Sequence, residues 1–272
     1  MASNRPAYAA KPKLIRRSPI TKALRLLNWL IETSEAEVGV RQMAAALRLS
    51  PSNAHQLLTS LLAEGYVQRD PDSGRYSLGL ELLRWAHRIV GRIPLRTVAL
   101  PQMQALVEAC NETVFLGVYD PTRREMMFAA SVESMHPLRY VIELNRWFPV
   151  TAGASGLSIL AFLPDAEIDT VLKKKLVART PTTIVDPKRL RTELSGIRKR
   201  GYAISRGQRE PGAVGIGAPI FDHDAEVVGD IVITSPEQRY DRRKADMLGR
   251  LVRSHADFIT RDLGGRYPKT PR

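Results

Sequence analysis

Histidine and cysteine are the first residues to consider, because imidazole and thiolate groups serve catalysis and metal binding. The sequence has one cysteine, Cys110, and five scattered histidines: His55, His87, His136, His223 and His255. No pair of histidines has the HExxH spacing, and no Cys/His cluster has the spacing of a zinc site. We therefore expect no metal and no cofactor.

Two glycine-containing stretches are close to catalytic motifs, but each departs from its motif. GASGLS (153–158) contains Gly-Ala-Ser-Gly, whereas a nucleophile elbow requires Gly-x-Ser-x-Gly, and Leu157 stands where the last glycine belongs. GAVGIG (212–217) lacks the lysine of a phosphate-binding loop and lies in a strand-like context. We therefore expect that the protein is not an enzyme.

Hydrogen-bonding side chains gather instead in SPSNAHQLL, residues 50–58. In the first turns of a helix such groups can reach base edges and phosphates in the major groove, and Asn and Gln match the paired donor and acceptor of adenine. The other interpretation is that Ser50 only caps the helix and that His55 is solvated. The expected DNA-contacting residues of this helix are Ser50, Ser52, Asn53, His55 and Gln56.

The elements around this stretch have a characteristic order. A helix is predicted from the cap signal Ser18-Pro19, a short strand at 37–40 and a second helix at 41–47. The first helix has apolar residues at helical spacing, namely Leu24, Leu27, Leu30 and Ile31. The helix that starts at Ser50-Pro51 ends at Gly65, and its expected buried face is Leu57, Leu58, Leu61 and Leu62.

A hairpin follows, because strand-like residues 66–70 and 75–79 flank the tight turn Pro-Asp-Ser-Gly (71–74). Helix, strand, helix, turn, helix and hairpin is the order of a winged helix-turn-helix. In that fold Arg69, Ser73 and Arg75 of the wing would lie near phosphates, and Arg41 at the start of the second helix could meet the DNA backbone as well.

The charge of the chain favours an anionic partner. Its 272 residues carry a formal net charge of +13, and residues 1–25 contain seven Lys or Arg and no acidic residue. This segment is either a solvated tail or an arm that contacts phosphates. A single cysteine fits a reducing compartment, and neither a membrane span nor a signal peptide is recognisable. We expect a cytoplasmic protein.

The second half of the chain has a mixed pattern. Strands are predicted at 112–120, 125–133, 136–144, 202–207, 213–222 and 225–235, and helices at 97–111, 153–163, 186–201 and 241–265. This pattern predicts an antiparallel α+β domain that binds a small molecule between sheet and helix. The start of the 153–163 helix would offer N–H groups to a carboxylate or carbonyl, although its small residues could equally serve close packing.

The chain resembles the IclR family of bacterial transcription regulators from about residue 18 to 263. The resemblance rests on four stretches: SPSNAHQLLTSLLAEGYVQRDPDSGRYSLG, PLRYVIELNRWFPVTAGASGLSILAFLP, TPTTIVDPKRLRTELSGIRKRGYAIS and EPGAVGIGAPIFD. It implies a winged helix-turn-helix, a linker helix and a GAF-like effector-binding domain. It also implies dimers or tetramers on palindromic operators, with the winged helices and linkers commonly forming the dimer.

The departures from the family signature concern the effector pocket. Gly201 and Ser205 match the signature, but Gln208 replaces its glutamate and Gly215 stands at its Cys/Ser/Ala position. Family members that bind small polar acids carry two serines where this chain has Val232 and Thr234. A further departure lies in the expected DNA-binding helix, where many members have Arg at the position of Gln56.

The departures at the pocket positions imply a roomier, less polar pocket and a larger, partly apolar effector such as an aromatic carboxylate. The expected pocket residues are Ala154, Ser155, Gly156, Ser205, Gly215, Val232 and Thr234, with Met127, Phe128 and Trp147 as apolar walls. The leading hypothesis is a ligand-responsive regulator whose partners are a double-stranded DNA operator, a small effector and a second copy of itself. The alternative is a sensor that acts through a protein partner, with the winged helix as the interaction module.

The expected organisation has five parts. Residues 1–17 form a basic flexible arm, 18–79 the DNA-binding domain, 80–95 the linker helix, 96–263 the effector-binding domain and 264–272 a flexible tail.

Overall fold

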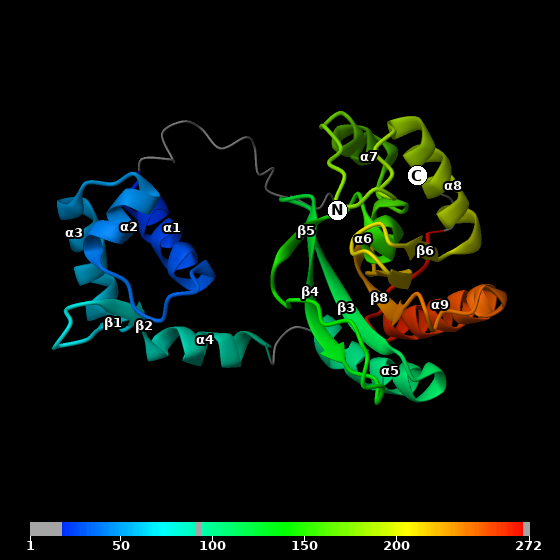
Figure 1. Ribbon diagram of the computed structural model, residues 1–272, viewed down its shortest axis with the longest axis horizontal. Coiled ribbons are helices and arrows are strands. Elements are labelled where there is room, and N and C mark those ends of the chain that lie inside the picture. The colour runs from blue at the N-terminus through cyan, green and yellow to red at the C-terminus, as the bar shows by residue number, and fades with distance from the viewer. Residues whose placement is uncertain (1–17, 91–93, 269–272) are drawn as a thin grey trace, which may run out of the picture. The chain divides into compact units, whose positions relative to one another are not determined.

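The computed structural model describes residues 18–90 and 94–268, without the side chains of His87 and Val90 (Figure 1). The chain divides into two compact units, residues 1–92 and 93–272. The expected basic arm, residues 1–17, lies outside the described residues, as do residues 91–93 and 269–272. Within the described residues no helix has the length and apolar character that a membrane span needs.

The first unit has the predicted order of elements. They are α1 (Pro19–Glu32), α2 (Val40–Leu47), α3 (Pro51–Ala63), β1 (Val67–Arg69), β2 (Tyr76–Leu78) and α4 (Leu80–Val90). The two strands pair antiparallel, with Val67 opposite Leu78. The short strand expected at 37–40 is a single bridge, in which Val38 and Tyr76 exchange backbone hydrogen bonds of 2.8 and 2.9 Å. The N-terminal unit is therefore a helix-turn-helix with a hairpin wing.

The core of this unit is formed where the three helices meet, around Leu26, Met43 and Leu58. In α1, Leu24 and Ile31 are 57% and 56% exposed, although their spacing suggested a buried face. The helix carries two apolar stripes, and Leu26 and Leu30 form the one that is buried. Helical periodicity alone does not tell which of two stripes a fold buries.

The second unit begins with a helix and continues as a sheet with helices on both faces. Its elements are α5 (Pro94–Cys110), β3 (Thr113–Asp120), β4 (Glu125–Val132), β5 (Trp147–Pro149), α6 (Gly153–Leu160), α7 (Asp165–Leu172), α8 (Pro187–Arg200), β6 (Ala203–Arg206), β7 (Ala213–Phe221), β8 (Val227–Pro236) and α9 (Ala245–Asp262). A short 3₁₀ turn, Arg242–Lys244, precedes α9. The strands form one antiparallel sheet in the order β5-β4-β3-β8-β7-β6, as expected for the α+β class.

Residues on successive positions of a strand face opposite sides of this sheet. On β8, Ile231 and Ile233 pack with α5 and α9, whereas Val232 faces the core that α6, α7 and α8 cover. Figure 1 shows α5 and α9 beneath the sheet and α6, α7 and α8 above it. Asp230 and Thr234 therefore share with Val232 the face that is covered by α6.

The strand predicted over residues 136–144 is not formed, and this prediction is wrong. The edge of β4 that such a strand would need is taken by β5, which pairs Trp147 with Met127. The segment instead follows an irregular path, in which the Tyr140 hydroxyl donates to the carbonyl of Pro211 at 2.8 Å. Alternating hydrophobicity could not reveal this, because a strand also requires an open neighbouring edge.

Two boundaries also differ from expectation. Pro94 and Leu95, which we assigned to the linker, belong to the first turn of α5. The tail expected to be flexible from residue 264 is packed over its described part: Tyr267 makes edge-to-face ring contacts with Phe162 and Phe221, at centroid distances of 5.5 and 4.8 Å. The apolar ring of Tyr267 gives this segment a packing site that its charged, proline-containing sequence did not suggest.

Candidate functional site

Helix α3 is anchored by one face and exposes the other. Ala54, Leu57, Leu58 and Leu61 are buried, and the Ser50 hydroxyl accepts a hydrogen bond from the Asn53 N–H at 3.2 Å. The capping role predicted for Ser50 is thereby confirmed. Of the side chains outside the wing that are expected to contact DNA, Asn53 is half-buried, and the exposed ones are Arg41, Ser50, Ser52, His55 and Gln56.

The hairpin wing is built around Asp70. Its Oδ1 accepts the N–H groups of Asp72 and Ser73 at 3.1 and 2.6 Å, and the hydrogen bonds from Ser73 lower the pKa of the Asp70 carboxyl. Gly74 completes the turn with a φ of +67°, a left-handed conformation that glycine adopts without strain. The wing therefore keeps a fixed shape that presents Ser73 to solvent.

The two arginines of the wing have different surroundings. Arg69 is exposed, and its Nε donates only to the nearby carbonyl of Gly74, at 3.3 Å. Arg75 donates to the carbonyl of Glu37 at 2.7 Å and pairs with the Glu35 carboxylate at 3.4 Å. Arg75 was expected near phosphates, but the structure uses its guanidinium to tie the wing to the segment between α1 and α2.

Sequence analysis missed one arginine beside α3. Arg48 lies in the turn between α2 and α3, is exposed, and adopts a left-handed φ of +54°. An exposed cation next to the start of α3 has the chemistry of a phosphate contact. Its position in the turn RLS between two predicted helices was the available signal.

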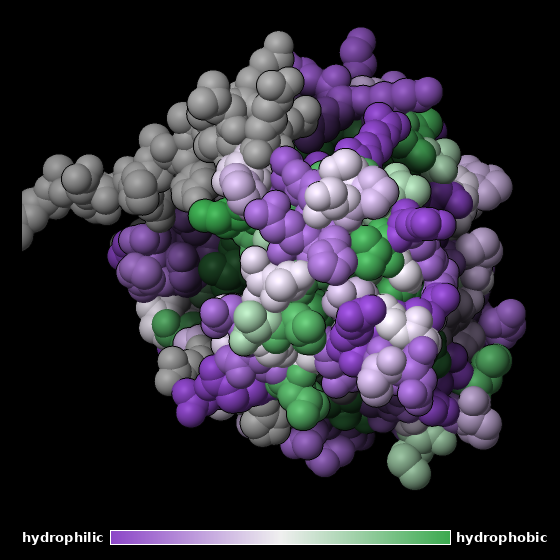
Figure 2. Space-filling view, turned by 90° about the vertical axis from the view of Figure 1, so that its left-hand side faces the viewer, coloured by the Kyte–Doolittle hydropathy of each residue, from purple (hydrophilic) through white to green (hydrophobic). Residues whose placement is uncertain are grey.

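Hydrophilic side chains predominate around scattered hydrophobic ones on the face in Figure 2, which looks onto the left-hand side of Figure 1 where α3 lies. A mixed polar surface of this kind suits contact with phosphates and base edges better than contact with an apolar protein partner.

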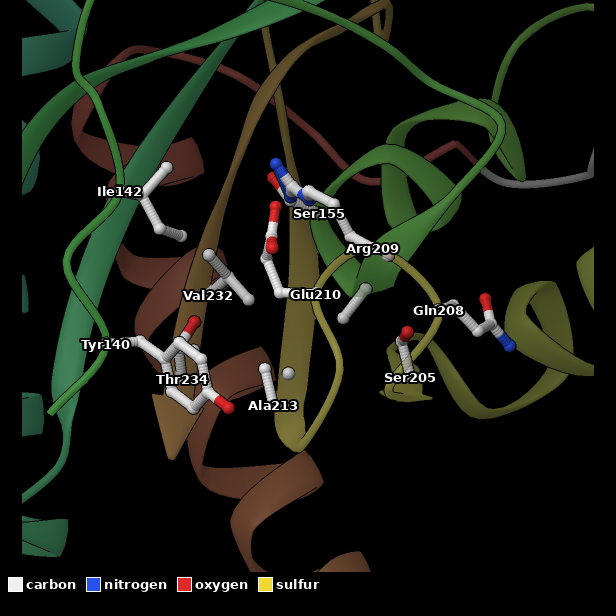
Figure 3. Close-up of a pocket in the computed structure, with 13 residues that line it drawn as sticks. Tyr140, Ile142, Ser155, Ser205, Gln208, Arg209, Glu210, Ala213, Val232 and Thr234 are labelled. Carbon is white, nitrogen blue, oxygen red and sulfur yellow. The ribbon is translucent and has the colours of Figure 1, made fainter. Parts of the chain in front are cut away.

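The second unit contains a pocket between α6 and the sheet (Figure 3). Its cavity volume is small, about 40 Å³, and the total empty space with the open solvent at its mouth is about 430 Å³. Six of the residues predicted to contact an effector line it: Ala154, Ser155, Ser205, Gly215, Val232 and Thr234. They come from α6, β6, β7 and β8, and the register explains their convergence, because Gly215 lies opposite both Ser205 and Thr234.

Four of the predicted residues lie elsewhere. Gly156 packs against the backbone of Val150, and Phe128 is buried in the core beneath the pocket. Met127 pairs with Trp147 between β4 and β5, and the Arg123 guanidinium lies over the Trp147 ring. None of these four residues lines the pocket.

Sequence analysis missed seven lining residues: Tyr140, Ile142, Gly153, Gln208, Arg209, Glu210 and Ala213. Most of them belong to irregular segments, the stretch before β5 and the connection between β6 and β7. Gln208 was noted only as a departure from a signature, and this was the available signal for that connection.

Gly215 does not act as expected. The prediction was that its missing side chain would enlarge the pocket, but a Cβ at this position would lie 3.0 Å from the Cβ of Ala154. Gly215 therefore lets the start of α6 pack closely against β7, and the room gained is filled by the helix.

An aspartate is completely buried beside the pocket. The Ser155 hydroxyl donates to Oδ1 of Asp230 at 2.5 Å, while no hydrogen bond reaches Oδ2 from the described residues. Burial raises the pKa of the Asp230 carboxyl to about 7, against the opposing influence of Ser155 and of the positive charge of Arg209. Gly117 and Gly217 on the neighbouring strands leave room for the carboxylate.

Arg209 brings a cation to the same side of the pocket. Its guanidinium carbon lies 4.7 Å from the ring centre of Phe128 and 5.2 Å from that of Phe148. Burial lowers the pKa of Arg209 to about 10, which leaves it charged at neutral pH. The pocket thus combines apolar walls with one positive charge at its wall.

No histidine is among the pocket-lining residues, and the Ser155 hydroxyl uses its proton in the bond to Asp230.

In the turn between β7 and β8, Asp222, His223 and Asp224 bring candidate metal-ligand atoms within 4.8 Å of one another. The Asp222 carboxylate there accepts the N–H groups of Asp224 and Glu226 at 3.0 and 2.9 Å, so it stabilises the turn.

Comparisons with known proteins agree with both units. Residues 19–71 match the family described as "IclR helix-turn-helix domain", and residues 87–261 match "Bacterial transcriptional regulator IclR C-terminal". The HTH-type transcriptional regulator KipR of Bacillus subtilis is 30% identical over 250 residues, which cover 92% of this chain and 98% of that protein.

Solved structures of similar proteins share the fold. The Thermotoga maritima IclR structure is 31% identical, with a TM-score of 0.71, and the match covers 90% of this chain and 98% of the other. An IclR homologue from Microbacterium hydrocarbonoxydans, solved in complex with 4-hydroxybenzoate, is 26% identical with a TM-score of 0.77 and coverage of 91% and 99%. The relatives are DNA-binding transcription regulators and not enzymes, as expected from the sequence. The chain belongs to the IclR family of bacterial transcription regulators.

Proposed function

We propose that this regulator binds a palindromic operator as a dimer or tetramer and responds to a small, partly apolar carboxylate. The observation that carries the DNA-binding part is the two-sided character of α3. Leu57, Leu58 and Leu61 are buried, whereas Leu62, which was expected on the same face, is 39% exposed. Ser52, His55 and Gln56 are exposed in the first two turns. A helix held in this way can place its polar residues in a major groove without losing its packing.

The proposed contacts divide into two kinds. Ser52, Asn53 and Gln56 would read base edges, because amide side chains offer a donor and an acceptor together. Phosphate contacts would come from exposed basic, imidazole and hydroxyl side chains around α3, namely Arg41, Arg48, Ser50, His55, Arg69 and Ser73. Residues 18–79 would therefore be the DNA-binding domain.

Self-association is supported by apolar side chains that the first unit leaves exposed. On α1, Ile20 and Leu24 are 72% and 57% exposed, and on α4, Leu80 and Leu83 are 77% and 66% exposed. Exposed rows of large apolar residues typically become buried at an interface. We assign these rows to the contact with a second copy, which would place two α3 helices on the two halves of a palindrome.

The second unit would bind the effector in the pocket beside α6. Ile142, Ala154 and Val232 provide apolar surface, and the hydroxyls of Ser205 and Thr234 provide a few polar groups. An aromatic carboxylate such as the 4-hydroxybenzoate bound by the Microbacterium relative has this combination of an apolar ring and polar ends.

The effector would act on operator binding through the linker helix α4 (Leu80–Val90). A ligand shifts the equilibrium between two arrangements only by its difference in affinity for them. If effector binding favours one packing of the effector domains, the linker helices would change the spacing of the two α3 helices. A saturating effector that left operator affinity unchanged would contradict this coupling.

Fluorescence anisotropy with the purified protein tests the proposal. The protein is titrated onto DNA from upstream of its own coding region and onto a scrambled sequence of equal length, at near-physiological salt. We expect a preference of roughly 10³-fold or more for the native sequence. Equal, steeply salt-dependent affinity for both DNAs would contradict specific binding at that site and would favour the sensor that acts through a protein partner.

A further inference from the structure

Arg209 is a half-buried cation at the wall of the pocket, and one of its guanidinium nitrogens is buried without a partner. Its Nη1 is inaccessible to solvent and has no hydrogen-bond partner, and among the described residues none accepts a hydrogen bond from this guanidinium. Arg209 as a whole is half-buried, and Nη1 is the guanidinium nitrogen that is shielded from solvent without a partner. Leaving an N–H donor unpaired away from water is costly.

The buried carboxylate nearby does not satisfy this cation. Asp230 attracts Arg209 through its charge, but the hydrogen bond at its Oδ1 comes from Ser155, and Oδ2 has no partner. Arg209 and Asp230 form no direct ion pair in the described structure. Asp230 therefore reduces the positive electrostatic potential around Arg209 but accepts no hydrogen bond from its guanidinium.

Two aromatic rings fix the guanidinium in place. The rings of Phe128 and Phe148 lie within 5.8 Å of each other, and Arg209 stacks on both. Gly153, at the start of α6, makes this position possible, because a Cβ there would lie 3.0 Å from the Nε of Arg209. In Figure 3 the side chain of Arg209 runs from the connection between β6 and β7 toward Ser155, at the wall of the pocket.

Other charges near Arg209 do not neutralise it. Arg179, whose guanidinium lies 5.9 Å from the ring centre of Phe148, adds a second positive charge that acts on Arg209. Glu210 is exposed at the mouth of the pocket and acts only at a distance. The inner side of the pocket therefore remains a site for an anion.

We propose that Arg209 is the specificity-determining residue of the pocket and that it pairs with the carboxylate of a planar, ring-bearing monoacid. The planar fork of a guanidinium matches a carboxylate with two parallel hydrogen bonds. The ring of the acid would lie toward Ile142, Ala154 and Val232, and its carboxylate would point inward. This inference rests on the proposed function, because it names the ligand class of the same pocket.

The test compares acids with uncharged analogues of equal shape. Benzoate and 4-hydroxybenzoate, with benzamide and 4-hydroxybenzamide, are titrated by calorimetry into the full-length protein and into Arg209→Gln. Arg206→Gln is the matched control, since it removes a cation three residues away whose Nη2 pairs with Glu237 and which does not line the pocket. Arg209→Lys keeps the charge and removes the planar fork.

We expect the wild type and Arg206→Gln to bind at least one acid 10-fold or more tighter than its amide. Arg209→Gln should lose that preference, and Arg209→Lys should retain part of it. Equal acid affinity in the wild type and Arg209→Gln would overturn the inference, and so would the absence of acid binding by the wild type at millimolar concentration. Operator affinity without ligand is measured for each variant. An unchanged operator affinity shows that Arg209→Gln is folded. A wild type without operator preference would contradict the proposed function. The acid titrations would still decide the role of Arg209 in that case.

Discussion

The Cβ that Gly117 lacks would lie 2.0 Å from Oδ1 of Asp230. The two residues are directly opposite each other on β3 and β8, so a side chain at Gly117 would enter the space of the buried carboxylate. Gly217 flanks the same carboxylate on β7, where a Cβ would lie 3.1 Å from Oδ2. The buried aspartate therefore depends on glycine in both neighbouring strands.

The first prediction concerns Gly117→Ala. The added methyl group has no room beside Asp230 and Ser155, so we expect a loss of about 2–3 kcal/mol in the free energy of unfolding, as for other overpacked cores. Urea unfolding followed by circular dichroism measures it. Asp230→Ala in the same chain should recover part of the loss. Gly196→Ala in α8, where only the flexible end of Arg200 is near, is the control and should not destabilise.

The second prediction concerns pH. Since burial raises the pKa of Asp230 from 3.8 to about 7, the folded state holds a proton that the unfolded chain has already released. The contribution of this group to stability therefore falls as the pH rises from about 4 to about 7, and the full penalty applies above pH 7. Asp230→Asn carries no such penalty and should exceed the wild type in stability at pH 8, by on the order of a few kcal/mol.

This advantage should shrink steadily toward pH 5 in urea unfolding experiments. The control is Gln104→Ala, an exposed position on α5 that carries no titratable group, for which the difference from the wild type should not depend on pH. A constant difference between Asp230→Asn and the wild type across this range would contradict the assignment of a raised pKa to Asp230.

The third prediction compares two serines that precede a proline at a helix start. The Ser50 hydroxyl caps α3, whereas Ser18 occupies the same position before α1 without a side-chain capping bond. Ser50→Ala should cost about 1 kcal/mol of stability, and Ser18→Ala should cost much less. Thermal unfolding of the two variants measures the difference. Equal losses would mean that the cap of α3 contributes no more than an ordinary surface hydroxyl.

The fourth prediction compares the two wing arginines. Arg69 is exposed and available to a phosphate, so Arg69→Gln should reduce the slope of log affinity against log salt by about 0.9. Arg75 is engaged by Glu35 and Glu37, so Arg75→Gln should leave that slope nearly unchanged and lower stability instead. Operator titrations at several salt concentrations distinguish the two. The opposite pattern would show that Arg75 leaves its protein partners on DNA.

Local signals in the sequence predicted much of the fold. Ser50-Pro51 and Asp186-Pro187 mark the starts of α3 and α8, and in both helices the cap accepts the expected backbone N–H. These signals involve residues only three positions apart, so no tertiary contact is needed to recognise them. The strand wrongly expected at 136–144 failed for the complementary reason, since its formation depended on an edge that β5 occupies.

The pocket could be predicted only in part. The positions of Ser205, Gly215 and Thr234 follow from strand register, which alternation in the sequence largely determines. The burial of Arg209 is decided by Phe128 and Phe148, residues 81 and 61 positions earlier in the chain, and no local pattern reports such a contact. Likewise, whether Gly215 opens space or admits a helix depends on where α6 lies.

The attachment of the wing has a consequence for the thermodynamics of DNA recognition. Val38 is bridged to Tyr76, and Arg75 is bonded to Glu37, so the hairpin and the segment between α1 and α2 are held together before any DNA arrives. A wing held in this way loses little conformational entropy on binding. Operator association should therefore show a smaller entropic penalty than is typical of recognition by a loop that becomes ordered on the DNA.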